Sequence, residues 1–420
     1  MTRLLNARTF ASLRRHRNYR LYFLGQVISL SGTWMQNIAL AWVVVGLTHS
    51  PVAVGLLAFL RFAPFTVFSL PAGVLADRFD NRRTMMAMQA VSMVISAVLA
   101  ALVLLGRPAL WEIYVLAVLA GTAAVFDAPN RHALTFQMVG RDELPNAVAL
   151  NASLFNGSRV IGPAIGGVVI AAAGVGACFA VNALSFLAVL TALALMRKRE
   201  LFPLERREAP RLVQGVRHGL GYVWRTPSIR LVLLMTMVVS TVGFNFHVLV
   251  PVVASKTLHV GAEVFGALGA AFGLGALAGA LLAATFARAS WKALVLGSAG
   301  FSVTLLALAP ETTVWPIALL LFLTGVFFTT WTANSQSIVQ LTAPDHLRGR
   351  VLSIYLFAFG GFAPLGGLLA GWLSDVGGTQ LAFFVAGITC LAMTAYAFLA
   401  WPRQASEERA EELDTQRLAA

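Results

Sequence analysis

The sequence predicts an all-α membrane protein with twelve transmembrane helices, arranged as two parallel repeats of six. Three observations predict it: a composition poor in charge, twelve apolar segments of spanning length, and matching motifs in the two halves. Of the 420 residues, 58% are hydrophobic and 12% are charged, whereas soluble globular proteins carry about 25% charged residues. We therefore expect most of the surface to face lipid.

A helix needs roughly 20 mostly apolar residues to cross the hydrocarbon core of a bilayer. Twelve segments meet that requirement and leave no room for a separate soluble domain. Their approximate bounds are 20–46, 52–75, 84–105, 112–137, 145–172, 177–196, 229–253, 262–285, 292–309, 314–339, 351–374 and 380–401. The chain then divides into an N-terminal six-helix bundle (1–196), a cytoplasmic linker (197–228), a C-terminal six-helix bundle (229–402) and a cytoplasmic tail (403–420).

The basic residues are placed asymmetrically. The net charge of +13 is compatible with nucleic-acid binding, but all except five of the 31 Lys and Arg residues lie at the ends of spans that share one side. The exceptions are Arg61, Arg107, Arg131, Arg159 and Lys256. Because cytoplasmic loops carry the excess of Lys and Arg, we expect a multi-pass protein of the cell inner membrane, with both termini in the cytoplasm and no nucleic-acid partner.

The predicted linker contains an amphipathic pattern. Apolar residues recur at helical spacing, at Leu212, Val216, Leu220, Val223 and Trp224. Polar residues occupy the opposite face, at Arg211, Gln214, Arg217 and Arg225. The pattern is typical of a helix that lies on the membrane surface; the alternative is a plain solvated linker.

The two halves of the chain repeat each other. Asp142-Glu-Leu-Pro-Asn-Ala-Val148 corresponds to Asp345-His-Leu-Arg-Gly-Arg-Val351, and His49 aligns with His259. Each half has an even number of predicted spans, so the halves share one orientation. Parallel repeats of this kind occur in transporters whose substrate site lies near the midplane between the repeats.

Two motifs carry further information. The loop after the second span reads Gly73-Val-Leu-Ala-Asp77-Arg78-Phe-Asp80-Asn-Arg82-Arg83. Asp77 can cap a helix or pair with arginine. The fifth span contains Gly162-Pro163-Ala-Ile-Gly166-Gly167, in which glycines four apart allow close helix approach and the proline bends the helix. The alternative for this second motif is helix packing without directional meaning.

These motifs resemble those of the major facilitator superfamily, the first being its loop 2–3 signature and the second the motif of its exporter branches. Further phrases resemble the enterobactin-exporter and macrolide-efflux group, over about residues 13–400: Pro129-Asn-Arg131, Leu144-Pro-Asn-Ala-Val-Ala-Leu-Asn151, Arg159-Val-Ile-Gly-Pro163 and Leu347-Arg-Gly-Arg-Val351. The resemblance implies efflux of a small organic molecule by alternating access, driven by the proton gradient without a cofactor. It also implies a cytoplasmic gate formed by Gly73, Asp77, Arg78, Arg82 and Arg83.

Polar residues form stripes on the first, fourth, seventh and tenth spans, and the third, sixth, ninth and twelfth are plainer. A single Ser or Thr often bonds its own helix backbone, but four stripes together indicate a cavity lined by these four spans. The predicted substrate pathway consists of Gln26, Thr33, Gln36, Asn37, Arg61, Asn130, Arg159, His247 and Asn334.

Charges inside membrane spans are costly and mark functional sites by default. Asp127 is the only carboxylate deep in a predicted span, and Arg131 lies four residues later on the same helical face. Asp127 is therefore either a proton-coupling site that Arg131 releases during the cycle or half of a structural ion pair. Arg61 and Arg159 leave a positive surplus, which favours anionic or hydrogen-bond-rich substrates; alternatively, both bond backbone carbonyls between helices.

Other function classes find little support. No metal-ligand cluster, nucleophile–base pair or phosphate-binding loop is visible, so we expect no metal, no cofactor and no enzyme activity. The expected partners are a small organic substrate, protons and the lipid bilayer. We expect a monomer, because each half already buries the inner face of the other. The remaining alternatives are an uptake transporter or lysophospholipid translocator of the same fold and, more remotely, a membrane receptor or enzyme.

Overall fold

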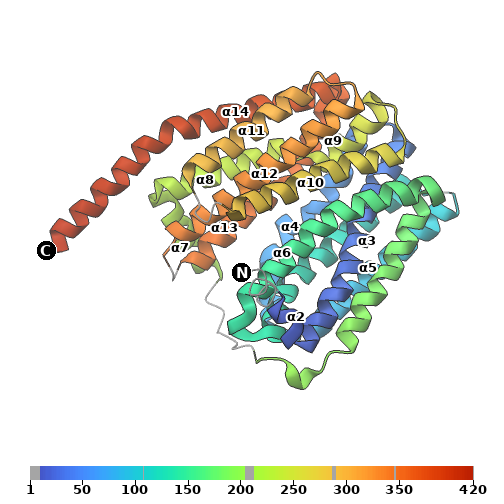
Figure 1. The fold of residues 1–420 in the computed structure, drawn as a ribbon, viewed down its shortest axis with the longest axis horizontal. Helices are drawn as coiled ribbons and strands as arrows, with labels where there is room; N and C mark the ends of the chain where they lie inside the picture. The colour runs from blue at the N-terminus through green and yellow to red at the C-terminus, as the bar shows by residue number, and fades with distance from the viewer. Residues whose placement is uncertain (1–9, 107, 204–211, 286–289, 345–346, 420) are drawn as a thin grey trace.

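The computed structural model describes residues 10–106, 108–203, 212–285, 290–344 and 347–419, of which 70, 73–77, 212–216, 284–285 and 401–419 are described as backbone only. The described residues form helices and connecting turns and contain no strand. Figure 1 shows two helical bundles side by side, with the last helix extending beyond them.

The N-terminal half contains α2 (Ala11–Arg15), α3 (Arg17–Thr48), α4 (Pro51–Arg78), α5 (Asn81–Leu104) and α6 (Leu110–Ala194). The 3-10 turn η1 (Lys198–Glu200) and α7 (Leu212–Arg225) follow it. The C-terminal half contains α8 (Pro227–Val238), η2 (Val239–Gly243), α9 (Phe246–Val252), η3 (Val253–Thr257), α10 (Ala262–Thr285), α11 (Trp291–Leu308), α12 (Val314–Thr342), α13 (Arg348–Gly360) and α14 (Ala363–Ala419).

Glycines divide the longest helices into spans. α6 has non-helical backbone at Gly140 (φ 71°) and Gly174 (φ 79°), and α14 has it at Gly377 and Gly378 (φ 72°). Glycine adopts positive φ without a steric penalty, so the chain reverses there almost without a loop. Nine helical stretches of the described residues are long and apolar enough to cross a membrane. Split at these glycines they give twelve segments, consistent with the predicted number.

The internal repeat is visible in the backbone. His49 (φ 51°) and His259 (φ 54°) are the only non-glycine residues of the described chain with positive φ. They follow the first span and the seventh span, which are equivalent positions in the two halves. The sequence alignment of these two histidines therefore corresponds to a shared turn geometry.

The two halves meet where α6 packs on α10 and α4 packs on α14, and Figure 1 shows α6 beside α10. A Cβ atom at Gly266 of α10 would lie 2.7 Å from both the Cα of Gly167 and the carbonyl oxygen of Pro163. A Cβ at Gly55 of α4 would lie 2.6 Å from the carbonyl oxygen of Gly367 in α14. Backbone thus contacts backbone at both helix pairs, at the end of the molecule where α4 and α10 begin.

The seventh span is interrupted, whereas the sequence predicted one continuous helix over 229–253. α8 passes into a π-helix, η2, and Phe244 then leaves helical geometry (φ −91°, ψ 57°) before α9 begins. π-helical turns occur frequently at functional sites, and discontinuous membrane helices commonly form the binding sites of transporters. The eleventh span is also divided, into α13 and the start of α14.

The predicted linker contains the helix α7, which packs on the C-terminal half. Tyr222 donates a hydrogen bond to the carbonyl oxygen of Thr342 at the end of α12 (3.3 Å), and Val223 is buried. Leu220 and Trp224 are exposed. The side chains of Leu212 and Val216 lie outside the described ones, and the apolar residues of α7 that are described divide between contacts with the bundle and an exposed surface.

Candidate functional site

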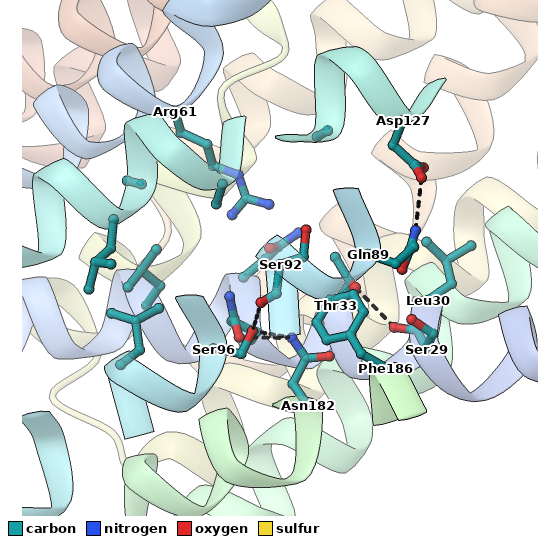
Figure 2. Close-up of a pocket in the computed structure, with 18 of the residues that line it drawn as sticks. Ser29, Leu30, Thr33, Arg61, Gln89, Ser92, Ser96, Asp127, Asn182 and Phe186 are labelled. Carbon is teal, nitrogen blue, oxygen red and sulfur yellow. Dashed lines mark hydrogen bonds between the residues drawn. The ribbon is translucent and has the colours of Figure 1, made fainter. Parts of the chain in front are cut away.

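A cavity of about 110 Å³ lies inside the N-terminal half, between α3, α4, α5 and α6 (Figure 2). Its polar lining consists of Gln26, Ser29, Thr33, Gln36, Asn37, Arg61, Gln89, Ser92, Ser96, Asp127, Arg131 and Asn182. Sites for drug-sized ligands measure about 300–1,000 Å³, so this cavity has room for a few water molecules but not for a drug-sized molecule.

The structure brings all four predicted pathway residues of the first span to this cavity, together with Arg61, Asp127 and Arg131. Sequence reasoning missed the contributions of α5 and of the last part of α6, since the third and sixth spans look plain. Gln89 and Asn182 are buried amides in segments whose other polar residues are mainly Ser and Thr. An amide in such a segment was a signal that could have identified them.

Asp127 is held from two helices. Its side chain is 7% exposed. Oδ2 accepts hydrogen bonds from Nε of Arg131 (3.1 Å) and from Nη2 of the same guanidinium, one turn along α6. Oδ1 accepts from Nε2 of Gln89 in α5 (3.0 Å), as Figure 2 shows. Both carboxylate oxygens are therefore bonded, and the ion pair is closed in this structure.

A second polar network joins α3, α5 and α6 at the same cavity. Nδ2 of Asn182 donates to Oε1 of Gln36 (2.8 Å) and to Oγ of Ser96 (3.3 Å). Oγ of Ser185 donates to Oδ1 of Asn182 (3.0 Å). Gly32 makes room for this network, because a Cβ there would lie 2.5 Å from Asn182 Oδ1.

The other two intramembrane arginines have no such partner. Arg61 points from α4 toward the cavity (Figure 2), and the described residues offer its guanidinium no hydrogen bond and no ion pair. Arg159 does not line the cavity. It lies on the middle part of α6, where aromatic rings from both halves surround its guanidinium.

Three predicted pathway residues contact helix backbone or an aromatic ring in this structure. Asn130 donates to the carbonyl oxygen of Phe126 in its own helix (2.7 Å). Asn334 accepts from the backbone N–H of Ser290, at the start of α11 (3.1 Å). The His247 ring packs edge-on against Phe62 of the other half, with centroids 5.3 Å apart.

Gly73 and Asp77, from the predicted cytoplasmic gate, are described as backbone only. Arg78 and Arg83 are exposed. Arg82 donates from Nε to the carbonyl oxygen of Leu193 (2.6 Å) and from Nη2 to that of Ala194 (2.9 Å). Arg82 thus satisfies free carbonyls at the end of α6, within its own half.

The glycine–proline motif of the fifth span lies at the contact between the halves. Gly167 contacts Gly266, and a Cβ at Gly269 would lie 3.2 Å from Cβ of Pro163. Gly162 and Gly166 face α3 instead, where added Cβ atoms would meet Trp34 and Ile38. The motif therefore packs one helix against two neighbours, one in each half.

Comparison with known proteins agrees with this architecture. The family model described as transmembrane secretion effector matches residues 7–418. The chain is 26% identical to the staphyloferrin A transporter of Staphylococcus aureus, over 90% of this chain and 95% of that protein. It is 27% identical to the multidrug efflux pump Tap of Mycolicibacterium fortuitum, over 87% and 91%. A POT family transporter solved with 5-aminolevulinic acid has the same fold (TM-score 0.76, 11% identity, 93% of this chain and 97% of that one).

The match to the family model covers nearly the whole chain, and the relatives are membrane transporters rather than enzymes. The predicted resemblance to superfamily exporters is thereby confirmed. The protein belongs to the transmembrane secretion effector family of the major facilitator superfamily.

Proposed function

We propose that this transporter exports small organic molecules, siderophore-like or drug-like, in exchange for protons and by alternating access. The proposal places the chain in the cytoplasmic membrane as a monomer, with both termini inside the cell. The observation that carries it is the buried Asp127 carboxylate, bonded to Gln89 and Arg131 beside a small polar cavity. The names of its relatives, a staphyloferrin A transporter and a multidrug efflux pump, support the substrate range.

The cavity suits protons better than cargo. Its volume of about 110 Å³ accommodates water, and water molecules can carry protons to a carboxylate. A proton on Asp127 would cancel its charge and release Arg131, whose guanidinium then needs another acceptor. The same helix face can therefore hold two states, one with Asp127 ionised and paired with Arg131 and one with Asp127 protonated and Arg131 released. Proton coupling requires two such states. The competing reading is that Asp127 and Arg131 form a permanent structural pair.

Alternating access is supported by the kind of contact between the halves. Glycine-to-glycine packing at Gly167 and Gly266, and at Gly55 and Gly371, interlocks few side chains. At these two contacts, the helices can separate without interlocked side chains holding them. The unpaired guanidinium of Arg159, which lies outside this small cavity, favours anionic or hydrogen-bond-rich cargo over simple lipophilic cations.

The test is proton flux in proteoliposomes loaded with a pH-sensitive dye, on addition of candidate siderophores and macrolides. Asp127→Asn is compared with the wild type and with Asp142→Asn, which makes the same chemical change at an exposed position. Cargo-triggered proton movement that only Asp127→Asn abolishes, with cargo binding retained, supports antiport with Asp127 as the coupling residue.

Two other outcomes of this experiment would support different conclusions about Asp127 and about the direction of transport. Proton movement that survives Asp127→Asn would leave antiport standing and reduce Asp127 to a structural partner of Arg131. No proton movement with any cargo would contradict the proposal and favour uptake or lysophospholipid translocation.

A further inference from the structure

The guanidinium of Arg159 lies inside an aromatic cage that spans both halves. Its Cζ atom is 4.8 Å from the ring centroid of Phe272, 5.4 Å from Phe244, 5.8 Å from Trp34 and 5.9 Å from Phe328. Trp34 comes from α3 of the N-terminal half, and the three phenylalanines come from the C-terminal half. All four distances are within the range of a cation–π interaction.

Local backbone features assemble the cage. Gly162 leaves space for Trp34, and Gly273 lets α10 approach so closely that a Cβ there would lie 3.0 Å from the carbonyl oxygen of Arg159. Phe244 lies in the interruption of the seventh span and stacks on Phe328, with centroids 4.4 Å apart and planes 6° apart. The glycine contacts and the helix break therefore converge on one arginine.

The cage stabilises the charge of Arg159 and leaves its hydrogen bonding unmet. Aromatic rings attract a guanidinium through their π-faces. They do not replace the acceptor atoms that its five N–H donors require. Within the described chain, no acceptor atom bonds these donors and no carboxylate pairs with them. The side chain is also partly exposed, so a ligand can reach it. An oxyanion that accepts two parallel N–H bonds is the chemical complement of such a group.

We infer that Arg159 and its four rings form the anion-binding subsite for cargo, selecting molecules in which a carboxylate is attached to a flat ring. The carboxylate bonds the guanidinium edge, and the ring packs among the phenylalanines. This inference rests on the proposed transport function and specifies its substrate class. Arg61 does not compete for the role, because it faces a cavity too small for a cargo of this size.

Binding of two probes tests the inference. The purified transporter is titrated calorimetrically with 1-naphthoate and with 1-naphthamide, which share one ring and differ in charge. We expect the wild type to bind the carboxylate at least tenfold more tightly. In Arg159→Gln we expect naphthoate affinity to fall on the order of tenfold to a hundredfold, with naphthamide nearly unchanged. Arg159→Lys keeps the charge but not the planar fork, so an intermediate loss is expected.

Two control variants match these changes. Arg197→Gln removes an exposed arginine, and Phe357→Leu removes a partly exposed ring that is not among those around Arg159. Both should keep the wild-type preference for naphthoate. Phe272→Leu removes the ring nearest to Arg159 and should weaken binding of both probes.

Three results would overturn the inference: a wild type that binds neither probe, a wild type that does not distinguish them, or a preference that survives Arg159→Gln. Equal losses for both probes in Arg159→Gln would indicate that Arg159 only fastens the two halves together. The titration uses no proton gradient, so a failure of proton coupling would leave its result intact. Conversely, absence of probe binding would leave antiport of other cargo standing.

Discussion

Gly266 should control the balance between the two arrangements of the halves. In Gly266→Ala, the added Cβ would lie 2.7 Å from Gly167 Cα, 2.7 Å from Pro163 O and 2.9 Å from Gly167 N. All three atoms are backbone, so no side chain can rotate away. Overpacking of this kind costs about 1–3 kcal/mol. The gain in helix propensity from Gly to Ala, about 1 kcal/mol, is common to both arrangements and cancels.

The clash acts only while α6 and α10 are in contact. The variant should therefore shift the equilibrium away from the observed arrangement by about 5- to 150-fold, which corresponds to 1–3 kcal/mol. Spin labels at Trp111→Cys and Trp315→Cys can report this shift, since these side chains are 66% and 85% exposed at equivalent ends of the two halves. Native Cys178 and Cys390 are buried and should escape labelling.

Pulsed electron paramagnetic resonance in lipid nanodiscs gives the distance distribution between the two labels. Gly266→Ala should add or enlarge a longer-distance population. Gly157→Ala is the matched control, because a Cβ there meets no atom within 4 Å, and its distribution should equal that of the wild type. A folded Gly266→Ala protein with an unchanged distribution would refute the reasoning that this glycine contact holds the halves together.

Three further substitutions test individual contacts. Asn182→Leu leaves the buried Gln36 carbonyl oxygen without its donor and should lower the free energy of unfolding by about 1–3 kcal/mol. A thermal melt with a thiol-reactive dye measures the loss. An unchanged melt would mean that water replaces the amide. Arg82→Gln removes two hydrogen bonds to the carbonyls at the end of α6 and should cost about 1 kcal/mol in the same melt, whereas no loss would show that the bonds are absent in solution. Thr66→Val deletes the hydrogen bond from α4 to the carbonyl oxygen of Gly361 (2.8 Å) and should favour separation of the halves about fivefold in the spin-label experiment. A distance distribution equal to that of the wild type would contradict this.

The spans and the repeat could be predicted because their physical signals are long and redundant. A spanning helix requires about 20 apolar residues, and the excess of arginine on alternate loops adds an independent signal. The turn at His49 and His259 was also within reach, since the same residue type recurs at equivalent positions in each half. The predicted pair of Asp127 and Arg131 follows from their spacing on one helix.

Other features depend on tertiary contacts that leave little trace in sequence. The predicted breaks after residues 137 and 172 turned out to be single glycines, because a positive φ replaces a loop. The interruption at Phe244 contains no proline and only one neighbouring glycine. Asn334 belonged to a polar stripe, yet its amide oxygen bonds the backbone of the neighbouring helix. Whether a polar side chain faces a cavity or a neighbouring backbone depends on which helix approaches it.

Helix α3 contributes side chains both to the cavity of the N-terminal half and to the aromatic cage around Arg159. Thr33 lines the cavity of the N-terminal half, and the next residue, Trp34, contacts Arg159 in the cage. Successive residues of a helix point about 100° apart, so one turn of α3 faces both places. The cage includes rings of the C-terminal half and must change when the halves separate, whereas the cavity lies within one half and can persist. A rotation or shift of α3 would therefore alter the surroundings of Arg159 and the bonding of Gln36 at once.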